Sequence, residues 1–168
     1  KNAVTQLSNV LRSSLQTSKQ ELIPLEKELQ IVKDYLEIEK ARYEERLNVE
    51  INIAPKSVKA MIPPLMLQTI VENAIKHGIG KLPSGGCVKI LSEHLEDYTE
   101  IQVLNSGQYQ PESNSDSNLG LENTKNRLKL SFGDSAWMSI GNLDEKTVRT
   151  IIHLPNSNKS GHDKNHDH

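Results

Sequence analysis

The pattern of apolar and polar positions along the chain predicts both helices and strands. Apolar residues recur three or four positions apart, the spacing of a helix face, over residues 3–16, about 25–45 and 62–78. Apolar and polar residues alternate over residues 49–53, which is the period of a half-buried strand. Further strands are expected over about 87–95 and 99–104, around Trp137 and Ser139, and over 147–154. The short turn at 96–98 predicts that two of these strands pair as a hairpin.

Apolar spacing also predicts which side chains form the core. In the second helix the expected core residues are Leu29, Val32 and Leu36, with Ile31, Tyr35 and Ile38 as further candidates. If the segment after residue 118 is an ordinary amphipathic helix, its core residues are Leu121, Leu128 and Leu130. Trp137 and Cys87 are expected to pack rather than to bind or react.

The helix over residues 62–78 has both ends marked. Pro63 and Pro64 suit its lead-in and first turn, and Gly78 suits a left-handed residue just past its end. At about 100° per residue, one arc of this helix is apolar and the opposite arc is polar. The apolar arc holds Leu67, Ile70, Val71 and Ala74, and the polar arc holds Thr69, Glu72, Asn73 and Lys76. One face therefore packs, and the other displays a carboxylate, an amide and an ammonium group.

The polar arc allows two interpretations. The first is a solvated helix surface without chemistry. Asn73 favours the second, a binding site, because asparagine is a mediocre helix former and here stands beside Glu72 and one turn before His77. Such oxygen ligands suit a hard cation like Mg²⁺, which is usually shared with substrate phosphates. Lys76 would then meet a phosphate as a point charge.

The same stretch resembles the Asn box of the GHKL ATP-binding fold, in the version of LytS/YehU-like bacterial sensor histidine kinases. It reads Val-Glu-Asn-Ala-Ile-Lys-His-Gly at residues 71–78, preceded by Pro-Pro-Leu-Met-Leu-Gln. The resemblance extends from about residue 25 to 154 and includes Tyr-Leu-Glu-Ile-Glu-Lys-Ala-Arg-Tyr at 35–43. It implies an α/β two-layer sandwich of the Bergerat (GHKL) type, with a mixed sheet, helices on one face and linker helices in front.

Two further segments carry the resemblance. Asn105-Ser106-Gly107 stands where the family usually has Asp-x-Gly-x-Gly, whose Asp accepts a hydrogen bond from the adenine amino group. An Asn carbonyl accepts the same bond without the charge, although by itself Asn-Ser-Gly is also an ordinary turn. Residues 119–128 resemble the box that closes the ATP lid, with Asn118 in place of its first glycine. The polar residues 108–118 then correspond to the lid and are expected to form a mobile loop.

The resemblance implies a role for each matched residue. The expected nucleotide-binding residues are Asn73, Lys76, His77, Asn105, Gly107, Gly120 and Leu121. Asn73 is expected to ligate Mg²⁺, Lys76 or His77 to lie at the phosphates, and Glu72 to act as base or water-orienting carboxylate. The implied cofactors are ATP and Mg²⁺. No P-loop, His-Glu-x-x-His or Gly-x-Ser-x-Gly motif occurs in the sequence.

The resemblance also divides the chain. We expect linker or dimerisation helices over residues 1–46, the ATP-binding domain over 47–155, and a disordered tail over 156–168, whose histidines form no preorganised metal site. The family's Pro-His-Phe-Leu-Phe-Asn motif, which holds the phosphoacceptor histidine, does not occur. Because the chain starts at Lys1 within an apparent helix, we expect a piece of a longer protein that begins downstream of that histidine.

Composition narrows the classes of partner. The chain has 168 residues, a net charge of -2 and a single cysteine, Cys87. This charge gives no electrostatic reason to expect nucleic acid or an anionic membrane as a partner. One cysteine excludes an intrachain disulfide.

The expected function is that of an enzyme, a protein histidine kinase of a two-component system. The domain would transfer the γ-phosphoryl group of Mg-ATP to a histidine absent from this chain, for relay to a response regulator. Expected partners are the phosphoacceptor helix of the same kinase, as a homodimer in the parent, and the response regulator, without nucleic acid or direct membrane contact. The domain would be cytoplasmic, in a parent anchored in the bacterial inner membrane.

Two alternatives stay open at this stage. Asn105 and Asn118, which stand where Asp and Gly are usual, favour a degenerate GHKL module that acts through protein contacts. A GHKL serine kinase or ATPase of another branch is the second alternative, and the linker sequence at 35–43 speaks against it.

Overall fold

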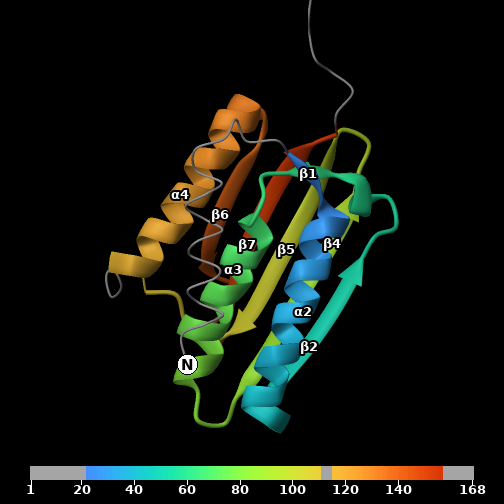
Figure 1. Ribbon diagram of the computed structural model, residues 1–168. Helices are drawn as coiled ribbons and strands as arrows, with labels where there is room; N and C mark the ends of the chain where they lie inside the picture. The colour runs from blue at the N-terminus through green and yellow to red at the C-terminus, as the bar shows by residue number, and fades with distance from the viewer. Residues whose placement is uncertain (1–21, 111–114, 157–168) are drawn as a thin grey trace, which may run out of the picture.

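A computed structural model describes residues 22–110 and 115–156, with backbone only for residues 115–118. The helix expected over residues 3–16 and nearly all of the expected tail lie outside these ranges. Figure 1 shows two layers, in which helices α2 (Leu25–Tyr43), α3 (Met66–Asn73) and α4 (Ser115–Phe132) lie side by side on one face of a sheet. The predicted α/β two-layer sandwich with helices on one face is therefore confirmed.

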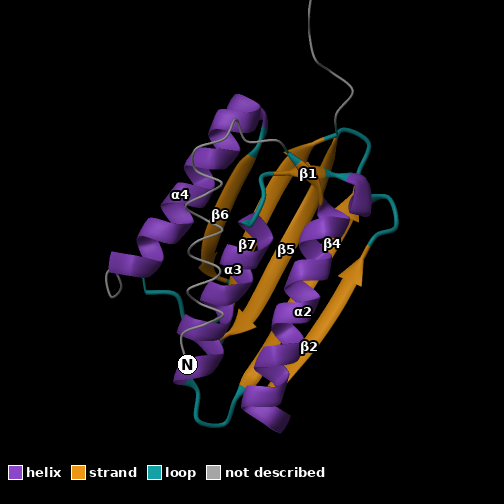
Figure 2. Ribbon diagram, viewed as in Figure 1, coloured by secondary structure: helices purple, strands orange, loops and turns teal. Residues whose placement is uncertain are grey.

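The sheet is mixed, as predicted (Figure 2). Its five strands are, in spatial order, β2 (Leu47–Ile53), β4 (Gly86–His94), β5 (Tyr98–Ser106), β7 (Thr147–Pro155) and β6 (Trp137–Asn142). β2 runs parallel to β4, and the other neighbours are antiparallel, including the expected β4–β5 hairpin. The register places Asn105, near the end of β5, between Val88 and Val148 of the flanking strands. The short strands β1 (Ile23–Pro24) and β3 (Met61–Ile62) pair separately.

The core lies between the helices and the sheet. Alternate residues of β5 and β7 are buried beneath the helices, among them Ile101, Val103 and Ile152. α2 contributes Leu29, Val32 and Leu36 from one stripe, as its apolar spacing predicts. Trp137 packs as expected but on the outside, where it is 45% exposed and stacks on His153 with ring centroids 5.2 Å apart.

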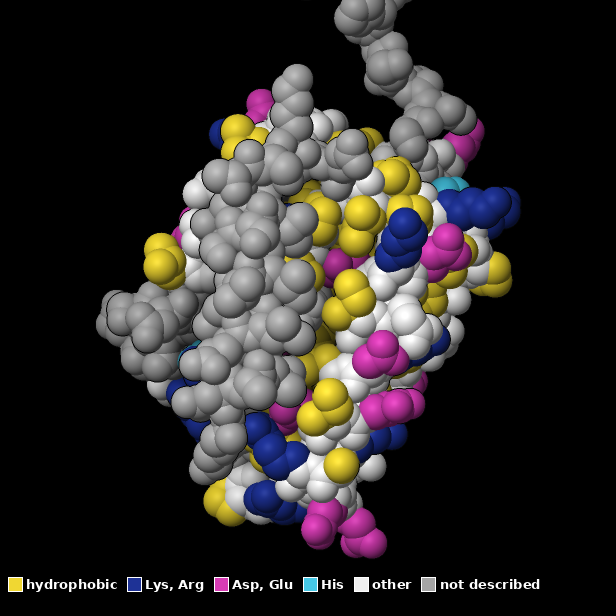
Figure 3. All heavy atoms as spheres, viewed as in Figure 1, with side chains coloured by type: hydrophobic (Ala, Val, Ile, Leu, Met, Phe, Trp, Pro, Cys, Tyr) yellow, Lys and Arg dark blue, Asp and Glu magenta, His cyan; other side chains and the backbone are white. Residues whose placement is uncertain are grey.

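Three predicted core residues are instead exposed. Leu130 is 83% exposed, Ile38 53% and Ile31 39%. Each follows a truly buried leucine by two positions, which on a helix is about 200° away, so the pair cannot share one face. Over α2, on the right of Figure 3, the outer surface accordingly mixes charged side chains with hydrophobic ones.

The helix of the Asn box differs from the expected one at both ends. It begins at Met66, after Leu65 in a left-handed conformation (φ 60°), and continues past Asn73 as a π-helical turn, Ala74–Gly78. The prediction that Gly78 is left-handed is wrong, because its φ is −94°. Close packing explains this glycine instead, since a Cβ there would lie 2.4 Å from Asn105 Nδ2 and 2.7 Å from the Ser106 carbonyl oxygen.

The expected loop over residues 108–118 is also too long. α4 already begins at Ser115. Ser, Asp and Asn are favoured at helix starts as well as in loops, so composition alone does not separate the two. In the described parts of the chain, no helix is long and apolar enough to cross a membrane.

Candidate functional site

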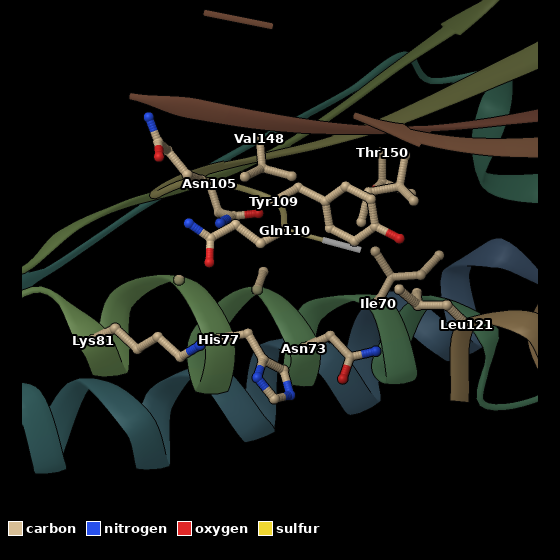
Figure 4. A pocket seen from close by; sticks show the side chains of 14 residues that line it. Ile70, Asn73, His77, Lys81, Asn105, Tyr109, Gln110, Leu121, Val148 and Thr150 are labelled. Carbon is tan, nitrogen blue, oxygen red and sulfur yellow. The ribbon is translucent and has the colours of Figure 1, made fainter. Parts of the chain in front are cut away.

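A pocket opens between α3, the inner face of the sheet and the first turns of α4 (Figure 4). The space between its walls is about 580 Å³, which includes open space at its mouth. The lining residues are Ile70, Asn73, Ala74, His77, Gly78, Lys81, Asn105, Gln108, Tyr109, Gln110, Leu121, Ile140, Val148 and Thr150.

α3 and the turn that follows it form one wall. Asn73 and His77 lie one turn apart on this wall, and both line the pocket (Figure 4). Asn73 Nδ2 is buried and has no hydrogen-bond partner among the described residues. Buried polar groups are nearly always paired, so an orphaned amide in a pocket wall is a group that a ligand can satisfy. The π-helical turn beside it is a feature found frequently at functional sites.

The floor of the pocket combines apolar side chains with two buried polar ones. Val148 and Ile140 come from β7 and β6, and the polar pair is Asn105 (7% exposed) and Thr150 (3% exposed). Gly107, just past β5, has φ 129°, a conformation open mainly to glycine, and a Cβ there would lie 3.2 Å from Gly78 Cα. Two glycines thus allow the end of the Asn-box segment to touch the end of β5.

Tyr109 lies across the pocket, near Ile70, Thr150 and Leu121 in Figure 4. Its backbone is tied to Asn142 at the end of β6: the Tyr109 N–H donates to Asn142 Oδ1 at 2.7 Å, and Asn142 Nδ2 donates to the Tyr109 carbonyl oxygen at 3.1 Å. Gln108 Nε2 donates to the Glu145 carbonyl oxygen at 2.8 Å in the same region. The segment that leads from β5 toward α4 is therefore fixed to the β6–β7 turn.

Basic groups gather around His77. Burial and the positive charges of Lys76 and Lys81 lower the pKa of His77, so its ring favours the neutral form. Lys81 lines the pocket, while Lys76 is exposed and does not. A site with these groups at its wall favours an anionic ligand.

The structure separates Glu72 from the pocket lining. Its carboxylate accepts a hydrogen bond from Gln68 Nε2 at 2.8 Å and acts electrostatically on Tyr35 and Glu39 of α2. Burial, with Glu39 and Glu72, raises the pKa of the Tyr35 hydroxyl. Burial and, to a smaller extent, Glu72 also raise the pKa of Glu39, which forms an ion pair with Arg42 at 2.7 Å. Glu72 therefore lies on the side of α3 that faces α2.

The residues predicted from the sequence are thus partly brought together. Asn73, His77, Asn105 and Leu121 line one pocket, whereas Glu72, Lys76, Gly107 and Gly120 do not. Gly107 is next to the lining through Gly78, and a Cβ on Gly120 would lie 3.8 Å from Thr69 Cγ2 of α3. Lining residues that the sequence analysis missed include Lys81, Tyr109 and Thr150. For these residues the sequence offers one signal: Tyr109 is the single aromatic residue within the polar stretch 108–118.

Comparisons with known proteins agree on one family. The family model described as "Histidine kinase" matches residues 1–47. Sensor histidine kinase BtsS of Escherichia coli K12 is 36% identical over 153 residues, which are 90% of this chain and 27% of BtsS. Sensor histidine kinase/phosphatase LytS of Staphylococcus aureus MRSA252 is 37% identical over 145 residues, 78% of this chain and 25% of LytS. The chain spans about a quarter of the length of these relatives.

Solved structures agree on the fold. The catalytic domain of histidine kinase ThkA superimposes with a TM-score of 0.62 at 16% identity, covering 82% of this chain and 96% of that one. Acinetobacter baumannii histidine kinase AdeS superimposes with a TM-score of 0.64 at 17% identity, covering 94% and 80%. The described residues have the fold of a histidine kinase catalytic domain. The homologues of this chain are sensor histidine kinases of the LytS and BtsS type, as the sequence motifs predict.

Proposed function

We propose that this chain provides the ATP-binding catalytic domain of a two-component sensor histidine kinase. The observation that carries this proposal is the buried amide nitrogen of Asn73, which has no hydrogen-bond partner within residues 22–110 and 115–156 and lies in the wall of a pocket that Asn105 also lines. The kinship with BtsS and LytS supports it. The reaction would transfer the γ-phosphoryl group of ATP to a histidine of the parent kinase.

The apolar and the polar side chains of the pocket lining support nucleotide binding in different ways. The apolar and aromatic side chains suit a flat base, and Asn105 with Gly107 would lie under the adenine, where the Asn carbonyl accepts from the amino group. Lys76 or His77 would meet the phosphates, and Gly120 with Leu121 would close the site at the start of α4. Because Lys76 is exposed in the structure, it would have to reach the phosphates from the rim of the pocket.

Mg²⁺ fits this pocket as an ion held mainly by the nucleotide. Within the described ranges, no three His, Cys, Asp or Glu side chains are grouped so that they could hold a metal ion by themselves. Mg²⁺ needs few protein ligands, because it keeps several waters and binds substrate phosphates. Asn73 Oδ1 would be the ligand from this chain, and the bound ion would neutralise charge on the phosphates.

The remaining catalytic work is positioning. Phosphoryl transfer depends chiefly on alignment and charge neutralisation, so the site needs few reactive side chains. Glu72 would act as base or orient water. Since it faces α2 rather than the pocket, the acceptor histidine would approach from that side of α3.

The wider context is also a proposal. Residues 1–46 would belong to the linker and phosphoacceptor region, 47–155 to the catalytic domain and 156–168 to a tail. The acceptor would be the phosphoacceptor helix of a homodimeric parent, and the phosphoryl group would pass to a response regulator. ThkA has been solved in complex with response regulator TrrA, at a TM-score of 0.63 and 18% identity to this chain, covering 92% of this chain and 48% of that one. The domain would be cytoplasmic, in a parent anchored in the inner membrane.

Calorimetric titration with ATP tests the proposal. We expect saturable binding that strengthens with Mg²⁺ and is weaker for GTP. Because the sequence lacks the phosphoacceptor motif, we expect no phosphohistidine on the isolated chain. Absence of binding with and without Mg²⁺ would contradict the proposal and favour a degenerate module that acts through protein contacts, to which Asn105 in place of Asp already points.

A further inference from the structure

The N-terminal end of α3 is held by a side chain from another helix. The first N–H groups of a helix have no partner within it, and Leu65, the N-cap residue of α3, makes no capping side-chain hydrogen bond to any described residue. Three backbone N–H groups at this end, those of Leu65, Leu67 and Gln68, instead donate to the carboxylate of Glu28 on α2. The distances to its two oxygens are 2.7, 3.2 and 3.4 Å.

Glu28 is built into the interior for this contact. It is 0% exposed, and a carboxylate without water is tolerated only where hydrogen bonds or charges replace the water. Burial raises the pKa of Glu28, while the three N–H groups and the charge of Arg127 oppose that rise. The partial positive charge at the start of a helix adds a further favourable interaction. Glu28 is therefore a cap for α3 supplied from α2.

α4 joins the same cluster. Arg127 of α4 donates from Nη2 to the carbonyl oxygen of Pro64, directly before Leu65, and its charge acts on Glu28. The cap cluster, as we name it, connects three neighbouring helices (Figure 1) and consists of the six residues Glu28, Pro64, Leu65, Leu67, Gln68 and Arg127. Two of the three helices, α3 and α4, also supply lining residues of the pocket.

The cap cluster lies close enough to the pocket to set the position of its wall. Asn73 is five residues beyond Gln68, which is about 7.5 Å along a helix axis. α3 has only eight residues, so a shift of its capped end is carried to Asn73 and to the turn that holds His77. We propose that Glu28 is a positioning residue of the nucleotide site: by capping α3 from α2, it fixes Asn73 and His77, so that the docking of α2 sets nucleotide affinity. This inference rests on the proposed function of the pocket.

A purely structural role for Glu28 is the rival explanation. Under that role, removing the carboxylate would lower the stability of the fold and leave the folded site unchanged. Under the proposal, the folded variant would also have a displaced pocket wall. The two are distinguished by measurements on the folded chain, well below its melting temperature.

Glu28→Gln is the informative variant, because it keeps the size of the side chain but removes its charge. It also replaces one accepting carboxylate oxygen by an NH₂ group, which cannot accept a hydrogen bond from the backbone N–H groups of α3. Glu26→Gln, on the exposed side of the same helix, is the matched control. In the absence of nucleotide, we expect the amide resonances of Asn73 and His77 to shift and the amides of Leu67 and Gln68 to exchange faster in Glu28→Gln only. We expect ATP affinity to fall roughly tenfold, within the range typical of coupling between separate sites.

A folded Glu28→Gln chain with unshifted Asn73 and His77 resonances and unchanged ATP affinity would overturn the inference, even if its melting temperature falls. If the unaltered chain binds no ATP, the proposed function fails. The amide resonances of Asn73 and His77 then still show whether Glu28 sets the position of the pocket wall. If Glu28→Gln does not fold, Glu28→Asp gives the same comparison, because it keeps the charge but withdraws the carboxylate by one methylene. Unshifted Asn73 and His77 resonances in Glu28→Asp would likewise overturn the inference.

Discussion

Gly78 and Asn105 touch across the floor of the pocket. A Cβ on Gly78 would lie 2.4 Å from Asn105 Nδ2, a distance that real side chains do not tolerate. The backbone of Gly78 has φ −94°, so alanine would be excluded by its neighbour rather than by backbone strain.

Gly78→Ala should therefore displace Asn105 and weaken ATP binding. Overpacking of this kind costs about 1–3 kcal/mol of stability. Thermal unfolding and ATP titration measure the two effects. Gly141→Ala is the control, because a Cβ there meets nothing within 4 Å. Equal stability and affinity of the Gly78→Ala and unaltered chains would contradict the close contact.

Asn73→Ala should abolish the Mg²⁺-dependent part of nucleotide binding while the fold persists. The amide nitrogen of Asn73 is buried and has no hydrogen-bond partner among the residues that the structure describes, so its removal should cost little stability. Titration with ATP in the presence and absence of Mg²⁺, together with the melting temperature, tests this. Asn126→Ala, at an exposed position of α4, is the control. Unchanged Mg²⁺ dependence in Asn73→Ala would mean that the metal ligand is elsewhere.

His77 should titrate below its ordinary pKa in the free chain. Burial and the charges of Lys76 and Lys81 lower the pKa of His77, so the folded state binds its proton less readily than the unfolded state does. Stability from this group is therefore present above about pH 6.5, the ordinary pKa of histidine, and is lost as pH falls below it.

NMR titration of the His77 ring measures this shift. Bound nucleotide should move the midpoint upward, because phosphate charges favour the protonated ring. His77→Gln identifies the resonance and should remove this part of the pH dependence of stability. A midpoint at or above 6.5 without ligand would contradict the prediction.

Asn142→Ala should loosen Tyr109 and reduce nucleotide affinity. Asn142 makes two hydrogen bonds to the Tyr109 backbone, and each typically contributes about 0.5–1.5 kcal/mol. We expect faster exchange of the Tyr109 amide and a several-fold loss of ATP affinity. Asn156→Ala is a matched control, because Asn156 Nδ2 likewise donates to two backbone carbonyls, those of Leu95 and Glu96, in the turn at the far end of β5. If both variants lose affinity equally, Asn142 has no special link to the pocket.

The periodicity of the sequence determined much of the architecture. The spacing of Leu29, Val32 and Leu36 identified the buried stripe of α2, and the alternation over residues 49–53 identified β2. These features depend on local geometry, because the 3.6-residue turn and the two-residue repeat are fixed by the backbone. The motif around Asn73 indicated the family because its residues are contiguous in the sequence and can be compared without knowledge of the fold.

Only the tertiary structure decided which elements meet. Glu72 and Asn73 are adjacent in sequence, yet Glu72 faces α2 and Asn73 faces the pocket. The sequence shows the arc of a helix on which a residue lies but not which element covers that arc. The contact of Glu28 with Leu65, across 37 positions, and the contact of Gly78 with Asn105 depend on how helices and sheet pack. The packing of segments that are far apart in the sequence produces no periodic pattern of residues in either segment. These contacts can therefore be found only in the folded chain.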